Sequence, residues 1–180
     1  MSTTTQIALP VGTWQVDPVH SHVGFGVQYT VGIFRGSFTG IDARLVVAED
    51  GSATLEGGAQ AVNIRVQDEN LNAHLLSPEF FDAERTPDIR FASDSVTRSG
   101  DELAVSGRLT IKGASQPVEL RGTLADPITD AFGSERLHLT LEGVVDRTQF
   151  GLDWNMELPS GGPALANDVT LTAELYFVKA

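Results

Sequence analysis

The sequence predicts an all-β domain of about eight antiparallel strands, arranged as a closed barrel or a sandwich. Most of the 180 residues alternate apolar and polar side chains with a period of two. Glycine-containing turn signals separate these runs at regular intervals, and there are eighteen glycines in all. No repeat or composition break marks a linker, so we expect a disordered tail over residues 1–11 and a single domain over residues 12–180.

The first two runs predict a hairpin. From Val19 to Tyr29 the apolar residues share one parity, which is typical of a half-buried strand. A turn at Val31 and Gly32 leads into the run 31–47, whose apolar parity changes around Gly40. A β-bulge at Gly40 accounts for this change, because a bulge adds one residue to a strand.

The remaining runs predict the rest of the sheet. A turn at 49–52 precedes a run over 53–66 that bends at its two adjacent glycines. Five further stretches alternate with period two, and hairpin-like joints connect some of them. These stretches are residues 88–96, 102–111, 116–126, 134–145 and 167–178.

The stretch 68–84 departs from the strand pattern. Leu71, Leu75 and Leu76 lie at helical spacing, and Ser77 followed by Pro78 is typical of a helix N-terminus. We therefore expect two short helical segments near residues 70–84, with the adjacent Phe80 and Phe81 packed against the sheet. They form either a lid on a barrel mouth or an ordinary plug in the core.

Composition excludes several classes of function. Twelve Lys and Arg residues against 24 Asp and Glu residues give a net charge of −12, which would repel the phosphate backbone of a nucleic acid. The chain has no cysteine, so thiolate chemistry is excluded. Its first residues lack the features of a secretory signal, and no stretch approaches the ~20 apolar residues of a membrane-spanning helix. We expect a cytoplasmic protein without an integral membrane segment.

His20 and His22 are the clearest candidates for a metal site. On one face of a strand, imidazoles at i and i+2 can ligate the same ion, but a third ligand is needed and the spacing of His74 and His138 supplies none. Ser21 points to the opposite face, so it cannot use either histidine as a base. We expect no metal and assign no catalytic residue.

The chain has more large apolar side chains than the turns of a small barrel require. An eight-stranded barrel is just wide enough to be filled by its own side chains or to hold one slender ligand, and periodicity alone favours the filled core. The residues concerned are Phe25, Val27, Phe34, Phe38, Leu76, Phe80, Phe81, Phe91, Leu109, Ile111, Phe150 and Trp154.

Six sequence blocks, in order and spread over residues 14–177, resemble the YceI-like polyisoprenoid-binding family. The blocks are WQVDPVHSHVGFGV, GIFRGSFTG, LNAHLLSPEFFDAERTPDIRF, GRLTIKGASQPVEL, DRTQFGL and NDVTL. The resemblance implies an extended, eight-stranded, lipocalin-like antiparallel barrel with a short helical segment over it. It also implies a homodimer and a long apolar channel for an isoprenoid chain, so that the twelve residues line a channel.

On this basis we expect a non-enzymatic protein that binds, carries or stores an isoprenoid lipid or similar long-chain amphiphile, without a cofactor. A quinone or a polyprenyl phosphate would fit, and Arg35 or Asn167 would meet its head group. The alternative is a barrel enzyme that acts on an apolar substrate through His20, His22 or a channel-facing acid. A histidine that points into the channel within hydrogen-bond reach of a carboxylate would favour it.

Overall fold

The computed structural model describes residues 8–180, so residues 1–7 of the predicted tail lie outside the described part. The next residues pack on the barrel. Leu9 is buried in the core, and the indole Nε1 of Trp14 donates a hydrogen bond of 3.0 Å to the carbonyl oxygen of Pro10. The guanidinium of buried Arg98 reaches the carbonyl oxygen of Ala8 at 3.4 Å.

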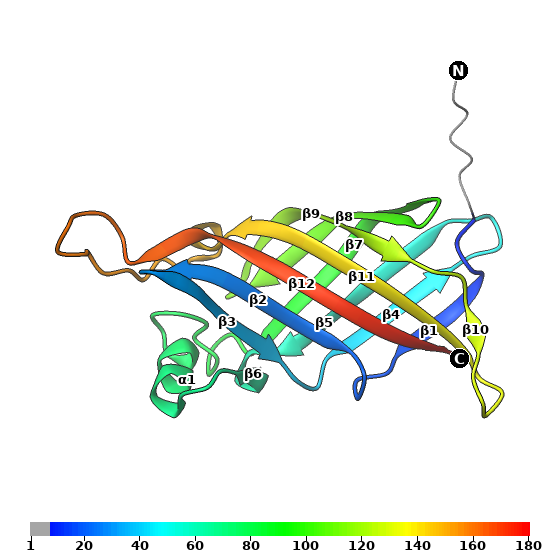
Figure 1. Cartoon of the computed structure of the whole chain (residues 1–180), viewed down its shortest axis with the longest axis horizontal. Coiled ribbons are helices and arrows are strands. Elements are labelled where there is room, and N and C mark those ends of the chain that lie inside the picture. The colour runs from blue at the N-terminus through cyan, green and yellow to red at the C-terminus, as the bar shows by residue number, and fades with distance from the viewer. Residues whose placement is uncertain (1–7) are drawn as a thin grey trace, which may run out of the picture.

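The predicted all-β fold is confirmed: eight antiparallel strands close into an elongated barrel (Figure 1). Pairing of β11 with β12 along eleven residues of each strand completes the ring. In ring order the strands are β1 (Gly12–Val16), β4 (Asp42–Val47), β5 (Ala53–Gln60), β7 (Asp88–Ser99), β8 (Glu102–Ile111), β9 (Ala114–Leu124), β11 (Glu135–Asp146) and β12 (Leu165–Lys179). The short β10 (Ile128–Thr129) lies beside β11.

A second hairpin extends one end of the barrel. The strand β2 (His22–Tyr29) pairs with β12 beyond the part of β12 that β1 occupies, and β3 (Gly32–Phe38) pairs with β2. Among residues 8–180, the other edge of β3 pairs only with β6 (Ile64–Arg65), at Ser37 and Phe38. The sheet is therefore incomplete beside β3, where α1 lies (Figure 1).

Two details of the predicted strands are wrong. Residues 39–41 form a bend in which Gly40 adopts a left-handed φ of 61°, so β3 and β4 are separate strands and not one bulged strand. The run predicted over 53–66 ends at Gln60, and the chain continues through a 3₁₀ turn, η1 (Ala61–Asn63), into β6. The first break lies where the chain enters the closed barrel at β4, and the second lies where it leaves the barrel after β5.

The helical segment is confirmed, but only its first half is a helix. The helix α1 (Glu69–Leu76) begins after Asp68, whose carboxylate accepts a hydrogen bond from the Leu71 amide. Ser77 ends this helix instead of beginning a second one, and its hydroxyl donates to the carbonyl oxygen of His74. The chain then folds through consecutive turns up to Arg85. Within residues 8–180, no helix has the length and apolar character needed to cross a bilayer.

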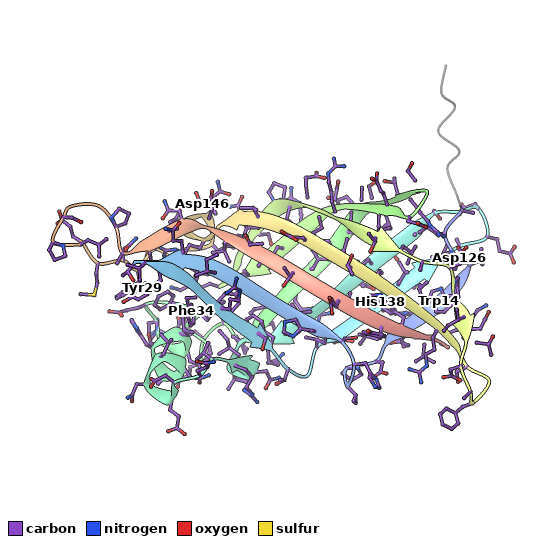
Figure 2. The ribbon with its side chains drawn as sticks, viewed as in Figure 1. Trp14, Tyr29, Phe34, Asp126, His138 and Asp146 are labelled. Atoms are coloured by element: carbon purple, nitrogen blue, oxygen red, sulfur yellow. The ribbon has the colours of Figure 1, made fainter. Side chains whose placement is uncertain are left out.

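Buried side chains form two clusters, one toward each end of the barrel. One cluster contains Trp14 and Phe177, and the other contains Ile64 and Phe150 together with the aromatic residues around α1. Trp14 and Tyr29 lie toward opposite ends of the barrel in Figure 2. The interior is packed differently toward the two ends, and the candidate site is found by comparing them.

Candidate functional site: an apolar cavity in the barrel

The barrel encloses a cavity of about 530 Å³. This volume lies within the range of small-molecule binding sites, which are largely apolar with a few polar groups. Aromatic and aliphatic side chains supply most of the wall, from β2, β3, β4, β5, β7, β8, β9, β11 and β12 and from the α1 segment. The interior is therefore not completely filled by its own side chains.

Eleven of the twelve predicted channel residues border this cavity. They are Phe25, Val27, Phe34, Phe38, Phe80, Phe81, Phe91, Leu109, Ile111, Phe150 and Trp154. Leu76 does not line it, because it lies on a different side of α1 from its neighbour Leu75, which is buried and does. Leu76 packs half-buried against the cluster around Phe150 instead.

Glycines leave room for two of the lining rings. A β-carbon at Gly36 would come within 2.5 Å of the ring of Phe25, and one at Gly107 within 2.7 Å of the ring of Phe91. Any larger residue at these inward-facing positions would displace the phenylalanine, since packed carbon atoms lie about 3.5 to 4.0 Å apart. The glycines thus allow the rings to lie against the barrel wall.

Aromatic residues of the α1 segment gather at one end of the cavity. The imidazole of His74 lies 5.0 Å, centroid to centroid, from both Phe80 and Trp154, edge to face in each case. Phe81 makes a similar contact with Phe38 of β3 at 6.1 Å. The segment thus covers the part of the cavity where the sheet is incomplete.

The opposite end of the barrel is closed. Trp14 and Phe177 are fully buried there, as are Leu45, Val105, Leu124 and Leu139, and none of these six borders the cavity. Tyr29, by contrast, borders the cavity and is 45% exposed. The cavity is therefore closed toward Trp14, and it reaches exposed residues at Tyr29 and also at Asp42 and Arg90. Tyr29 lies at the end of the barrel opposite Trp14 (Figure 2).

Arg147 is the most deeply buried charged residue that borders the cavity. Its Nη1 donates to the carbonyl oxygens of Leu152 and Trp154 at 2.5 and 2.9 Å, and its Nε donates to that of Ala166 at 2.8 Å. Within residues 8–180, no carboxylate lies within 4.0 Å of this guanidinium. Burial lowers the pKa of Arg147 from its ordinary value, and the nearby Asp146 and Asp153 oppose that shift. The cavity wall thus holds a buried cation without an ion-pair partner.

The two residues expected to meet a head group lie elsewhere. Arg35 and Asn167 are exposed and do not border the cavity, because each points outward from its strand. The polar residues that do border it include His74 and Arg147 at the α1 end. Exposed residues near the edge of β4 and β5 also border it, among them Asp42, whose carboxylate lies 3.5 Å from the guanidinium of Arg90.

The predicted geometry of the histidine pair is wrong. The strand begins at His22, whereas His20 lies in the preceding turn, where its Nδ1 is 2.7 Å from the carboxylate of Asp17. Neither histidine borders the cavity. In the described part of the chain, no three His, Cys, Asp or Glu side chains gather in a way that could hold a metal ion.

A different histidine satisfies the condition set for the enzymatic alternative. His74 borders the cavity, and its Nε2 lies 2.5 Å from Oε2 of Glu79. In the sequence, His74 stands out only as a possible third ligand for His20 and His22, and nothing in its spacing indicates the contact with Glu79. The lining residues Val169 and Leu171 continue the predicted alternation of β12, so the same pattern could have found them. No local signal indicated the role of Arg147.

Comparison with known proteins identifies the family to which the chain belongs. The model of the YceI-like domain matches residues 14–177, nearly the whole barrel. The chain belongs to the YceI-like family. A UPF0312 protein of Staphylococcus aureus (strain USA300) is 30% identical over 168 residues, which cover 89% of this chain and 94% of that protein. Protein YceI of Salmonella arizonae is 31% identical over 144 residues, covering 79% and 70% of the two chains.

Solved structures share the fold of this YceI-like chain. BcnA of Burkholderia cenocepacia superposes with a TM-score of 0.76 at 19% identity, over 89% of this chain and 98% of that one. A domain of Saccharophagus degradans, described as polyisoprenoid-binding, superposes with a TM-score of 0.68 at 11% identity, over 93% and 98% of the two chains. The resemblance found in the sequence blocks is thus confirmed.

Proposed function

We propose that this YceI-like protein binds an isoprenoid lipid, such as a quinone or a polyprenyl phosphate, and carries or stores it without chemical change. The observation that carries the proposal is the apolar cavity of about 530 Å³, which is closed toward Trp14 and reaches exposed residues such as Tyr29 toward the opposite end of the barrel. A long apolar chain fits such a cavity, because burial yields roughly 25 cal/mol per Å² of apolar surface before ordering costs. The relative from S. degradans, described as polyisoprenoid-binding, supports the same ligand class.

The chain of the ligand would extend from the α1 end toward the closed end of the barrel, where Trp14 and Phe177 are buried. Its polar head would stay at the α1 end, beside His74 and Arg147, because burying a polar group without a partner is costly. Arg35 and Asn167 are exposed and do not border the cavity, so His74 and Arg147 are better placed to meet the head group. An anionic head group would benefit from the unpaired charge of Arg147.

The pair of His74 and Glu79 supports one alternative function, an enzyme that abstracts a proton from an apolar substrate. Its imidazole borders the cavity, and a carboxylate orients the ring at 2.5 Å. We favour binding without chemistry because the two rings that contact His74, those of Phe80 and Trp154, are apolar and line the cavity. They supply no further acid or base for a reaction. The variant His74→Gln separates the two functions: it should retain lipid if the protein is a carrier, and abolish turnover if it is an enzyme.

Native mass spectrometry of freshly purified protein, followed by organic extraction, tests the main proposal. A stoichiometric long-chain isoprenoid that is recovered unchanged is the expected result. A protein that carries no lipid and also fails to take up added quinone would refute it. The family resemblance also suggests a homodimer, and sedimentation velocity of the same sample measures its oligomeric state.

A further inference from the structure

The open end of the barrel carries an apolar surface of its own. We propose that this surface, the apolar tip, docks on the face of an uncharged phospholipid bilayer so that lipid passes directly between bilayer and cavity. The apolar tip consists of the β2–β3 hairpin end, residues 29–34, and the loop 154–166. The proposal rests on the proposed lipid-binding function and adds the surface from which the ligand is taken.

The two parts of the apolar tip are joined by backbone hydrogen bonds. The amide of Thr30 donates to the carbonyl oxygen of Ala164 at 2.9 Å, and the amide of Ala164 donates to that of Met156 at 2.8 Å. The hairpin end and the loop therefore lie side by side, and both extend to the same extremity of the barrel (Figure 1). They form a projecting end and not a flat face.

Apolar side chains at this extremity face solvent. Val31 is fully exposed, and Ile33 and Met156 are 57% and 60% exposed. Tyr29 is also exposed and borders the cavity. The half-buried Trp154 and the buried Leu165 border the cavity from the loop 154–166. Four exposed apolar residues thus lie at the end of the barrel where the cavity reaches Tyr29. Such patches commonly mark a binding surface for a protein or a membrane.

The distribution of charge favours a bilayer over a charged partner. The apolar tip contains a single charged residue, Glu157, although 20% of the chain is charged and its net charge is −12. This end can approach a lipid surface without desolvating many charges, whereas the acidic surface of the rest of the barrel would repel anionic lipids. Tyrosine and tryptophan residues such as Tyr29 and Trp154 suit the boundary between water and lipid.

A second copy of the chain fits this end less well. A stable protein interface buries about 800 Å² on each partner, which a projecting tip with few exposed apolar side chains does not supply. Covering the tip would also block the opening beside Tyr29. A bilayer needs no flat complementary face, because lipids rearrange around inserted side chains.

Flotation of the full-length protein with phosphatidylcholine vesicles tests the proposal. The tip variant Val31→Ser with Met156→Ser should reduce partitioning by about tenfold for each apolar side chain that leaves the bilayer. The control variant Ile128→Ser with Phe132→Ser removes two exposed apolar residues near β10, away from the apolar tip, and should float like wild type. Serine leaves the net charge unchanged, and binding should be insensitive to added salt because it is not Coulombic.

A second readout separates docking from ligand binding. The initial rate of quinone transfer from the vesicles should fall in the tip variant in parallel with partitioning, while equilibrium uptake of quinone from detergent stays at the wild-type level. Flotation through the tip without uptake from detergent would retain the docking surface and refute the proposed ligand.

Three results would overturn the docking proposal. In the first, the tip variant floats as well as wild type. In the second, wild type fails to float. In the third, the tip variant converts a wild-type dimer into a monomer in the absence of vesicles, which would make a second copy the occupant of the tip.

Discussion

The ring of Phe91 on β7 lies against the backbone of Gly107 on β8, so close that a β-carbon at residue 107 would come within 2.7 Å of the phenylalanine Cζ. The same β-carbon would also collide with the carbonyl oxygen of Ala92. Phe91 borders the cavity. This glycine therefore sets the position of a ring in the cavity wall.

The variant Gly107→Ala should lower the free energy of unfolding by about 1 to 3 kcal/mol, which is typical of overpacking in a filled wall. The displaced Phe91 ring should also weaken lipid retention. Chemical denaturation measures the first effect, and native mass spectrometry measures the second. Gly32→Ala is the matched control: a β-carbon there meets nothing within 4 Å, so stability should change little. Equal stability of the two variants would contradict the packing seen at Phe91.

Two phenylalanines should separate lipid retention from stability. Phe81 borders the cavity, is half-buried and contacts Phe38 edge to face, whereas Phe177 is fully buried and does not border the cavity. We expect Phe81→Ala to lose bound lipid with a small fall in melting temperature. Phe177→Ala should destabilise the fold by about 3 to 5 kcal/mol. Unchanged lipid content in Phe81→Ala would show that this ring is not part of the binding site.

Even the conservative replacement of Arg147 by lysine should destabilise the protein. The guanidinium of Arg147 donates hydrogen bonds to the carbonyl oxygens of Leu152, Trp154 and Ala166 at the same time. The single ammonium of a lysine cannot donate to all three in the same geometry. Carbonyl groups left without a donor cost about 1 to 3 kcal/mol each when buried. We therefore expect Arg147→Lys to lower stability by about 2 kcal/mol or more, and hydrogen exchange to rise in residues 151–166. Wild-type exchange in this loop would exclude Arg147 as its anchor.

Two aspartates near the closed end should make stability fall in acid. A hydrogen bond with His20, then those from the Val19 amide and Arg136, lowers the pKa of Asp17 below its ordinary value of 3.8. Arg136, followed by the amide of Ser134, lowers the pKa of Asp130 in the same way. A carboxylate with a depressed folded-state pKa adds stability above its unfolded pKa, and this stability is lost as the pH falls through the folded value.

The free energy of unfolding should therefore be constant near neutral pH with respect to these two groups and should decrease below about pH 4. Urea denaturation at a series of pH values measures this slope. The double variant Asp17→Asn with Asp130→Asn should be less stable at pH 7 and should show a shallower decrease in acid. An identical slope in wild type and variant would assign the acid sensitivity to other carboxylates.

The sequence alone determined the strand content, the two-residue period that directs Leu109 and Ile111 inward, and the helical character of residues 70–76. These properties depend on neighbours along the chain, and alternation reports which face each side chain takes. The family could also be predicted from the sequence, because the six blocks that carry the resemblance are local patterns of residues. The break at Gly40 and the end of β5 at Gln60 were misjudged because pairing with distant strands, not local pattern, fixes where a strand ends.

Only the tertiary structure decided whether the barrel is filled or hollow. Trp14 and Phe25 have the same apolar character in sequence, yet Trp14 lies in the closed end and Phe25 borders the cavity. The contact of His74 with Glu79 and the carbonyl cage around Arg147 also depend on how a loop and a helix meet. The pairing of β11 with β12 places Arg147 beside Ala166, and no local pattern encodes the relative position of these two strands.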